Sequence, residues 1–269
     1  MYVKYLLDDE GTGHVFKRKK VYAKENSAFQ AIEISELEIL GKVLVLDNII
    51  QLSQLDSDRY HEAFAHIPVS NARNCTRFLI LGGGDGILAK ELLKYNNVIV
   101  DMVDIDPRVC ELSKVYLSDL NENSFDNERL NLHNSCALDF CKDAFAKKIK
   151  YDVIFADITD PHPNSPSKSL LSDSSITLYK GLLKKTGIFV SQTDNVQIAP
   201  QHADGVKNIL KRHFYNVGDY GIVALTLSSV FSFVYASNSI IIQQRPIEVK
   251  TKWLNQARFN LCLNILDNH

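Results

Sequence analysis

The sequence predicts an α/β protein with a doubly wound sheet of about seven strands, preceded by a small antiparallel β domain. From Phe78 onward, short apolar runs alternate with segments of helical periodicity, as in parallel sheets covered by helices. A glycine-rich turn, Gly82 to Gly86, follows the first of these runs. Residues 1–56, by contrast, contain strand-forming runs separated by turn residues. We therefore expect a β domain over 1–56 and a catalytic or binding domain over 57–269.

Composition limits the classes of function. The chain has 269 residues, of which 45% are hydrophobic, and a net charge of −2. It has no block of lysine and arginine, so we expect neither a nucleic acid polymer nor an anionic membrane as partner. No run approaches the ~18 apolar residues of a membrane helix, and the N-terminus does not resemble a secretory signal. Five cysteines without a C-x-x-C motif fit neither a disulfide framework nor a zinc site, so we expect a cytoplasmic protein.

The N-terminal segment reads as a meander of short strands. Asp47 and Asn48 form a turn before the last strand, which starts at Ile49. The strand-forming runs before this turn are Val15–Ala23, Ala28–Glu36 and Leu37–Leu46. About fifty residues cannot bury much core alone, so we expect this domain to pack on the main domain and on a second subunit.

The main domain alternates helices and strands. Pro68 is expected to end the first helix, Pro107 to open a later one, and Gly187 to cap another. The expected helices are Arg59–Ile67, one from Ile87, one from Pro107, Ala137–Ile149, Leu178–Lys185, Pro200–His213 and Leu254–Leu266. The expected strands are Phe78–Leu81, Val98–Val103, Leu130–His133, Tyr151–Asp157, Ile188–Thr193, and an antiparallel pair of Asn216–Leu227 with Val230–Ile242.

The glycine turn predicts a nucleoside site. Glycine permits positive φ and close approach of the backbone to a ligand, and Asp104, about 20 residues on at the tip of the second strand, can bind ribose hydroxyls. The alternative is a tight turn without a ligand. A dinucleotide fingerprint would place its last glycine at position 87, which is Ile87. Alternating glycines followed by Asp85 resemble instead the Rossmann-like S-adenosylmethionine-binding fold.

Four acids follow predicted parallel strands, at the sheet edge where ligands bind. They are Asp85, Asp104, Asp157 and Asp160. Crowded carboxylates cost free energy unless a positive group binds among them. A sulfonium or an ammonium group fits, whereas a metal is not expected, because no histidine or cysteine joins the acids at ligand spacing. Asp85 and Asp157 could alternatively serve as turn or cap residues.

Several motifs together identify a family. They are Val43-Leu-Val-Leu-Asp-Asn-Ile-Ile-Gln51, Tyr60-His-Glu62, Leu81-Gly-Gly-Gly-Asp-Gly86, Val103-Asp-Ile-Asp106, Tyr151 to Pro161 with its D-x-x-D-P, and Gln192. From about Ser27 to Thr193 the chain resembles the spermidine synthase family of aminopropyltransferases. The resemblance implies a homodimeric enzyme that moves a three-carbon amine from S-adenosylmethionine or its decarboxylated form, without a metal, to a small-molecule acceptor.

The resemblance also implies roles for individual residues. Asp157, Asp160 and Tyr60 would be catalytic, with Asp157 accepting a proton from the attacking amine or orienting it. The residues implied in donor binding are Gln30, Gly82, Gly84, Asp85, Asp104, Cys136, Ala137 and Asp157. The residues implied in acceptor binding are Gln51, Tyr60, His61, Asp160 and Gln192. The loop 158–172 would be a gate over the substrates.

Departures from the family pattern concern mainly the acceptor. His61 replaces a glutamine, Val223–Thr226 replaces I-P-[ST]-[YF], and the loop after Asp157 lacks its usual G-P-A. On the donor side, Cys136 replaces an acid at the adenine. We therefore expect a non-standard acceptor, such as the phosphate-bearing peptide-nucleotide modified by the microcin C tailoring enzyme. His61, Lys168 and Arg258 would then bind the phosphate of this acceptor.

Three alternatives remain open from the sequence. The first is an ordinary polyamine synthase, the second a methyltransferase on the same fold, and the third a nucleoside-binding subunit without activity. Retention of the acids argues against the third, because a binding protein has no evident use for a costly acid cluster.

Overall fold

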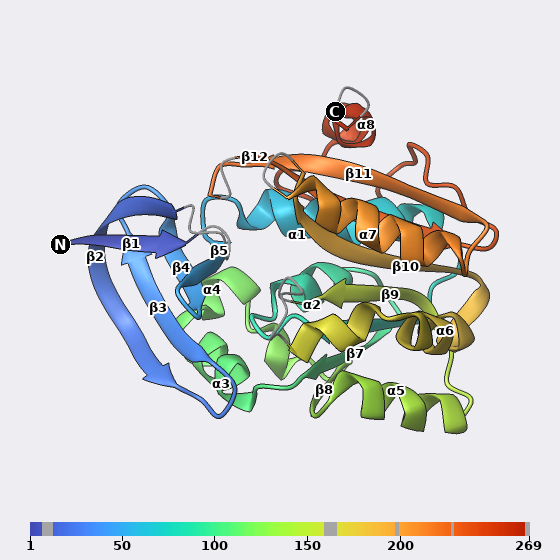
Figure 1. Ribbon diagram of the computed structural model, residues 1–269, viewed down its shortest axis with the longest axis horizontal. Coiled ribbons are helices and arrows are strands. Elements are labelled where there is room, and N and C mark those ends of the chain that lie inside the picture. Colours follow the sequence, from blue (N-terminus) through green and yellow to red (C-terminus); the bar gives the residue numbers. More distant parts are fainter. Residues whose placement is uncertain (7–12, 159–165, 197–198, 227–228, 267–269) are drawn as a thin grey trace.

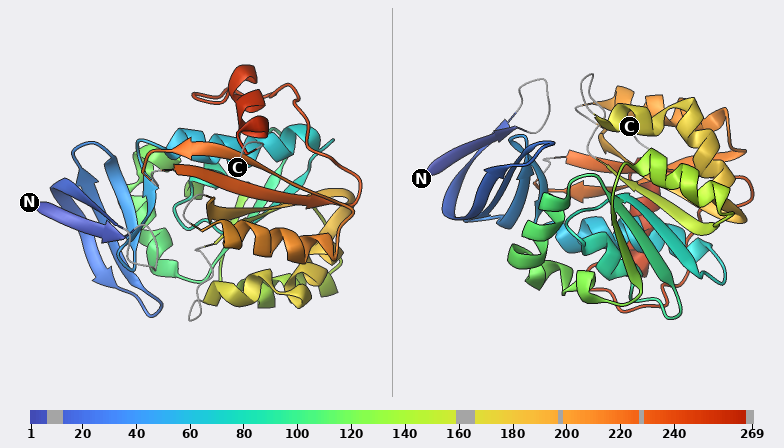
Figure 2. Two further views of the ribbon diagram at one scale, coloured as in Figure 1. Left: turned by 45° about the horizontal axis from the view of Figure 1, so that its top comes forward. Right: turned by 90° about the horizontal axis from the view of Figure 1, so that it is seen from below.

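The computed structural model describes residues 1–6, 13–158, 166–196, 199–226 and 229–266 (Figure 1). A five-stranded β barrel at one end is followed by a seven-stranded sheet with helices on both faces (Figures 1 and 2). This arrangement confirms the predicted fold class. Within the described residues, no helix has the length and apolarity needed to cross a membrane.

The barrel is closed by a parallel contact between its first and last strands, in which Leu6 lies opposite Ile49. Its strands are β1 (Tyr2–Leu6), β2 (Gly13–Asn26), β3 (Ala31–Leu37), β4 (Gly41–Leu46) and β5 (Ile49–Ser53). The strand expected over Leu37–Leu46 begins only at Gly41, because the chain turns at residues 38–40 and Gly41 has a φ of 68°. Asp47 and Asn48 both have positive φ, as a tight hairpin turn requires.

The large sheet has the strand order β11-β12-β10-β9-β6-β7-β8. Its strands are β6 (Arg77–Gly82), β7 (Ile99–Asp104), β8 (Leu130–Asn134), β9 (Tyr151–Asp157), β10 (Leu183–Asn195), β11 (Asn216–Ala224) and β12 (Ser229–Ser237). Strands β6 to β10 are parallel to one another, whereas β12 runs antiparallel to β10 and β11. The antiparallel pair expected near the C-terminus is therefore present.

The helices connect these strands and cover both faces of the sheet. They are α1 (Ser57–Asn71), α2 (Ile87–Leu92), α3 (Pro107–Tyr116), α4 (Ser118–Asn121), η1 (Ser124–Asp126), α5 (Ala137–Ala146), η2 (Pro166–Leu171), α6 (Asp173–Leu182), α7 (Pro200–Lys211) and α8 (Gln256–Asn264). In β6, Phe78 and Ile80 pack with α1 and α2, whereas Leu79 and Leu81 pack with α5, α6 and α7. Alternate residues thus enter two cores, which explains the unbroken apolar run.

The barrel packs on the helices that follow the glycine turn. Ile32 and Leu44 of the barrel share an apolar cluster with Val109 and Leu112 of α3. At the border of this cluster, the Asp106 carboxylate accepts hydrogen bonds from Ser27 at 2.6 Å and Gln30 at 2.9 Å. The expectation that the N-terminal segment packs on the main domain is confirmed.

Several predicted helix boundaries differ from the structure, and two of the differences have a clear physical cause. Helix α1 continues past Pro68 to Asn71. Proline cannot donate to the carbonyl of Phe64, but the Tyr220 hydroxyl lies 3.5 Å from that oxygen and replaces the lost donor. Helix α6 ends at Leu182, because β10 then begins to pair with Tyr151 of β9. Gly187 consequently lies inside a strand and caps no helix.

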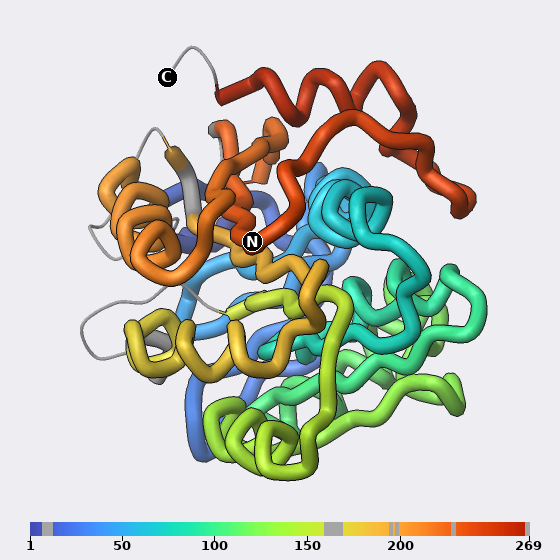
Figure 3. The backbone as a smooth tube through the Cα atoms, turned by 90° about the vertical axis from the view of Figure 1, so that its right-hand side faces the viewer, coloured from blue at the N-terminus to red at the C-terminus, as the bar shows by residue number. Residues whose placement is uncertain are grey.

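One buried carboxylate attaches the C-terminal segment to α1. Glu62 is fully buried. Its two oxygens accept hydrogen bonds from three consecutive backbone N–H groups, those of Lys252 at 2.7 Å, Trp253 at 2.8 Å and Leu254 at 2.7 Å. Figure 3 shows this segment (red) beside α1. Glu62 therefore fixes α1 to the C-terminal segment.

We predict that Glu62→Ala lowers the free energy of unfolding by about 2–4 kcal/mol, because three N–H groups lose their charged acceptor. Hydrogen exchange should accelerate most over residues 252–264. Glu111→Ala, which removes an exposed acid of α3, should change stability by less than about 0.5 kcal/mol. Equal effects of the two substitutions in urea denaturation would contradict this role of Glu62.

Candidate active site

Three of the predicted acids converge at the carboxyl edge of the sheet. Asp157 ends β9, Asp104 ends β7, and Asp85 follows β6, which lies between these two strands. In the ladder, Gly82 is paired with Asp157. The fourth acid, Asp160, lies outside the described residues, as do residues 159–165 of the expected gate.

The glycine turn is required by the close approach of β6 and β9. A Cβ atom on Gly82 would lie 2.0 Å from the carbonyl oxygen of Asp157, and Gly82 has a φ of 88°. The next residue, Gly83, donates its N–H to that same oxygen at 3.1 Å. A Cβ on Gly84 would lie 2.6 Å from a carboxylate oxygen of Asp104. Larger residues would therefore push the acids apart.

Asp85 combines two of the roles considered from the sequence. Its Oδ1 accepts the Ile87 N–H at 2.7 Å, at the start of α2. Its Oδ2 lies 3.9 Å from Nε2 of His61. One oxygen thus stabilises the turn, and the other is available to the cleft.

Asp104 is held by the turn that follows β7. Its Oδ1 accepts the Asp106 N–H at 2.8 Å, and burial raises the pKa of Asp104 to about 6. Gln30 reaches this turn from the barrel through its bond to Asp106. Sequence reasoning missed Asp106 as a site residue, although it is the second acid of the motif Val103-Asp-Ile-Asp106.

Cys136 and Ala137 lie beside the tip of β7. Asn134 of β8 is paired with Asp104, and the Ser135 N–H donates to the Asp104 carbonyl at 3.2 Å. The chain then enters α5, with Cys136 at the N-cap position, where its side chain makes no capping hydrogen bond. Both residues therefore adjoin the predicted ribose ligand.

Asp157 has the most perturbed carboxyl group of the cluster. Burial, followed by repulsion from Asp85, raises its pKa to about 8. The Tyr60 hydroxyl donates to its Oδ1 at 3.2 Å and opposes this shift. The ring of Tyr60 packs against Phe64 and Phe233, which fixes the direction of the hydroxyl.

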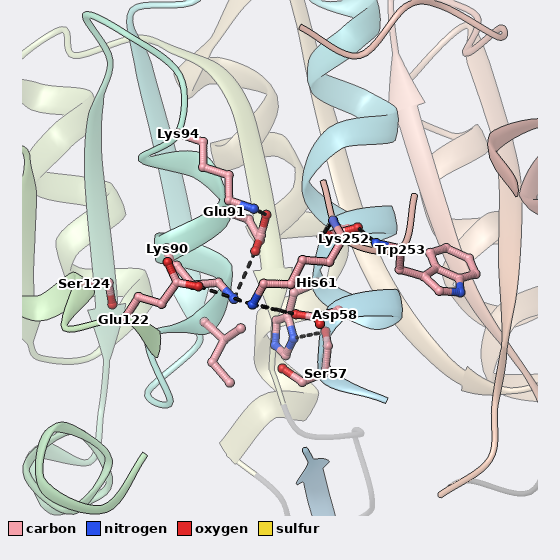
Figure 4. A network of polar contacts seen from close by, with 12 residues as sticks. Ser57, Asp58, His61, Lys90, Glu91, Lys94, Glu122, Ser124, Lys252 and Trp253 are labelled. Atoms are coloured by element: carbon pink, nitrogen blue, oxygen red, sulfur yellow. Dashed lines mark hydrogen bonds and ion pairs between the residues drawn. The ribbon is translucent and has the colours of Figure 1, made fainter. Parts of the chain in front are cut away.

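His61 presents a neutral nitrogen to this cluster. Its Nδ1 lies 2.8 Å from the carbonyl oxygen of Ser57, which can only accept, so Nδ1 carries the proton and Nε2 faces Asp85. Burial lowers the pKa of His61. Behind it lies a network of charged side chains that includes Lys90, Glu91 and Lys252 (Figure 4).

The cations of this network are already paired. Lys90 Nζ lies 3.1 Å from Glu91 and 3.9 Å from Asp58, and Lys94 and Lys252 pair with Glu91 and Asp58, respectively. Within the described part of the chain, no lysine or arginine forms an ion pair with the three acids of the cleft. Nor does any group of three His, Cys, Asp or Glu side chains there have an arrangement suited to a metal ion.

Three of the predicted acceptor residues line one cavity, and a fourth lies beside Asp157. Gln51 of β5, Tyr60 and His61 line a cavity of about 30 Å³, together with Thr226 of the altered stretch Val223–Thr226 and with Asp56, which the sequence did not reveal. Gln192 is placed beside Asp157, because its amide donates to the carbonyl of Ile158 at 2.5 Å.

Of the two further cations expected to bind an anionic acceptor, only Arg258 has a described side chain. Arg258 lies on α8, where it stacks on Trp253 and donates to its carbonyl oxygen, so it does not join the acid cluster. The side chain of Lys168 lies outside the described residues.

We predict that Asp157→Asn stabilises the ligand-free protein at high pH. Because the folded-state pKa of Asp157 is raised from 3.8 to about 8, wild-type stability is lost as pH rises through this window. The gain in melting temperature of the asparagine variant should therefore grow from pH 4 to pH 8 and then level off. Asp204→Asn, an exposed position on α7, should give a flat difference. A flat profile for Asp157→Asn as well would contradict the raised pKa.

Comparisons with known proteins agree with this geometry. A family model described as the spermine/spermidine synthase domain matches residues 57–244, and one described as the spermidine synthase tetramerisation domain matches residues 6–54. Polyamine aminopropyltransferase 1 of Hyperthermus butylicus is 33% identical over 227 residues, which are 84% of this chain and 78% of that protein. A polyamine aminopropyltransferase of Prochlorococcus marinus is 36% identical over 220 residues, 81% of this chain and 75% of that protein.

Two solved structures share the fold. Spermidine synthase from Thermotoga maritima superposes with a TM-score of 0.89 and 24% identity. A spermidine synthase in complex with the transition state analogue AdoDATO gives a TM-score of 0.90, also with 24% identity. Each comparison covers 100% of this chain and 93% of the other.

Proposed function

Because the chain belongs to the spermine/spermidine synthase family, we propose that it is a polyamine synthase that moves an aminopropyl group from decarboxylated S-adenosylmethionine to an amine. The observation that carries this proposal is the convergence of Asp85, Asp104 and Asp157 on a cleft where no described lysine or arginine pairs with them. Such a cleft attracts a sulfonium donor and an ammonium acceptor.

The donor would lie across the carboxyl ends of β6, β7 and β8. The glycine turn allows its sulfur end to approach the backbone, and Asp104 would bind the ribose hydroxyls. Cys136 and Ala137, at the start of α5, would contact the adenine, and Gln30 would approach the nucleoside from the barrel. The burial that raises the pKa of Asp104 supports a role in binding hydroxyl groups.

Charge favours the decarboxylated donor. Asp85 and Asp157 would hold its free ammonium group, and His61 is neutral because burial lowers its pKa. A donor that kept its α-carboxylate would bring a further negative charge to this cluster, and none of the described cations is unpaired beside it. Unpaired like charges in a partly buried site are strongly unfavourable.

The reaction needs little more than alignment and one proton acceptor. The neutral acceptor nitrogen attacks the carbon bonded to the sulfonium, the C–S bond breaks, and its electron pair neutralises the sulfur, so that methylthioadenosine leaves. The nitrogen loses one proton. Asp157, with its raised pKa, is suited to take it, and the Tyr60 hydroxyl would hold the carboxylate in position.

The relatives support an ordinary polyamine synthase better than the phosphate-bearing acceptor inferred from the altered acceptor motifs. The relatives from Hyperthermus butylicus and Prochlorococcus marinus are both polyamine aminopropyltransferases. The acidic cleft also argues against an anionic acceptor, since Arg258 is bound at Trp253. The comparisons likewise give no support to a methyltransferase.

We further propose the domain division 1–56 and 57–269, supported by the ranges of the two family models. The model for the first range is described as a tetramerisation domain, which supports a multimer without favouring the expected homodimer.

The first test is an assay of purified protein with decarboxylated S-adenosylmethionine and putrescine, in which methylthioadenosine is followed by mass. We expect turnover by the wild type. Asp157→Asn should lower kcat by about 100-fold or more, with the nucleoside part of the donor still bound at Asp104; Asp204→Asn should retain wild-type kcat. Wild-type activity in Asp157→Asn would refute its role, and the absence of product from any amine would refute the proposed function.

The pH profile provides a second test. Asp157 must be ionised to accept a proton, so kcat/KM should rise with pH up to about 8. Tyr60→Phe removes a hydrogen bond that lowers this pKa and should shift the acidic limb of the profile to higher pH. Titration of the acceptor is the same for both enzymes and cannot cause the shift. An unchanged limb would show that another group accepts the proton.

A further inference from the structure

A buried carboxylate connects the barrel with the donor side of the cleft. Asp106 is fully buried and lies two residues after Asp104. Its backbone N–H donates to Oδ1 of Asp104 at 2.8 Å. Most residue types could supply this backbone hydrogen bond, so the acid at position 106 must be explained by the contacts of its side chain.

The two carboxylate oxygens of Asp106 accept hydrogen bonds from different parts of the chain. Oδ1 accepts the Arg108 N–H at 3.0 Å and caps α3. Oδ2 accepts the Ser27 hydroxyl at 2.6 Å and the Gln30 amide at 2.9 Å, both from the connection between β2 and β3. An asparagine would cap α3 equally well. It is therefore the pair of donors at Oδ2 that requires an acid here.

Ser27 gives the connection between β2 and β3 a fixed shape. Its Oγ accepts the N–H groups of Phe29 at 3.0 Å and Gln30 at 3.1 Å. Its hydroxyl proton has two acceptors within reach, Oδ2 of Asp106 at 2.6 Å and the Gln30 carbonyl at 3.2 Å, and the charged and nearer acceptor is favoured. The backbone from which the Gln30 side chain starts is therefore attached to Asp106.

The hydrogen bond to Asp106 also decides the orientation of the Gln30 amide. An ionised carboxylate can only accept, so Nε2 of Gln30 must face Asp106 and Oε1 is left for another donor. The last side-chain torsion of a glutamine is otherwise soft and roughly two-fold. Without an acceptor at position 106, the amide could present either end to a ligand.

We propose that Asp106 is a positioning residue for the donor, which orients the Gln30 amide so that its Oε1 accepts a hydroxyl group of the nucleoside. Donor binding at the large sheet then depends on the barrel, because the barrel supplies Gln30 and Asp106 fixes it. This inference rests on the proposed aminopropyl transfer, in which Gln30 and Asp104 bind the nucleoside, and adds the contact that couples them.

The test measures the Kd of methylthioadenosine by calorimetry. This compound has the nucleoside but no amine, so its binding reports on the donor side without the ammonium contacts of Asp85 and Asp157. Asp106→Asn keeps an oxygen for the α3 cap but places a donor where the Gln30 amide requires an acceptor. We expect the Kd and the KM of the decarboxylated donor to rise about tenfold, with kcat and the acceptor KM within about threefold of wild type.

Two further variants separate this role from general support of the fold. Glu25→Gln weakens the ion pair of the barrel with Arg108 of α3, which joins the same two parts of the molecule without touching Gln30. Its Kd should stay within about threefold of wild type. Gln30→Ala removes the amide that Asp106 orients. In this background, Asp106→Asn should change the Kd by less than about twofold, because the two residues act through one contact.

The outcomes separate the inference from the proposed function. If Asp106→Asn weakens binding by the same factor with and without the Gln30 amide, Asp106 only supports the fold and the inference is wrong. If it binds methylthioadenosine as tightly as the wild type, the inference is wrong although aminopropyl transfer stands. If the wild type binds no methylthioadenosine, both fail.

A variant at the other end of the contact tests the inference if Asp106→Asn does not fold. Gln30→Glu has nearly the same shape but places a second carboxylate against Oδ2 of Asp106, so the side chain should be driven out of its position. We expect it to weaken methylthioadenosine binding at least as much as Gln30→Ala. Wild-type affinity in Gln30→Glu would show that position 30 need not donate to Asp106, and would overturn the inference.

Discussion

The close approach of β6 to β9 is the constraint on which the rest of the site depends. Gly82 fits against the Asp157 carbonyl because it has no Cβ, and the Gly83 N–H bonds to the same oxygen. This contact brings Asp85 and Asp157 into one cleft, where burial and then repulsion from Asp85 raise the pKa of Asp157. The repulsion between these acids is a cost to the folded state that the cationic substrates would relieve.

The surrounding structure keeps this unfavourable cluster in place. Two apolar cores enclose the parallel strands, and the barrel covers the turns after β6 and β7. Helix α1 is held on one side by the aromatic packing of Tyr60 and on the other by the bonds of Glu62 to the C-terminal segment. The side chains that face the cleft are therefore attached to elements that cannot easily move apart.

The sequence predicted the features that depend on local pattern. Strand ends, the glycine turn and the acids after β6, β7 and β9 could be located because residue type and spacing specify them. The continuation of α1 through Pro68 could not, since its replacement donor, Tyr220, is 156 residues away. Asp56 was missed for the same reason, because its partner Thr226 joins it only through the tertiary fold. Residues 159–165, which include Asp160, stay a matter of prediction.

The hairpin of β11 and β12 has a consequence for how such enzymes diverge. Asp85, Asp104 and Asp157 all lie on or directly after parallel strands in the first part of the large sheet, whereas Thr226 follows β11 at the antiparallel edge. Substitutions at this edge can change the shape and polarity of the acceptor cavity without disturbing the strands that hold the acids. The acceptor cavity can thus change there while the acids keep their places, and the altered stretch Val223–Thr226 lies at this edge.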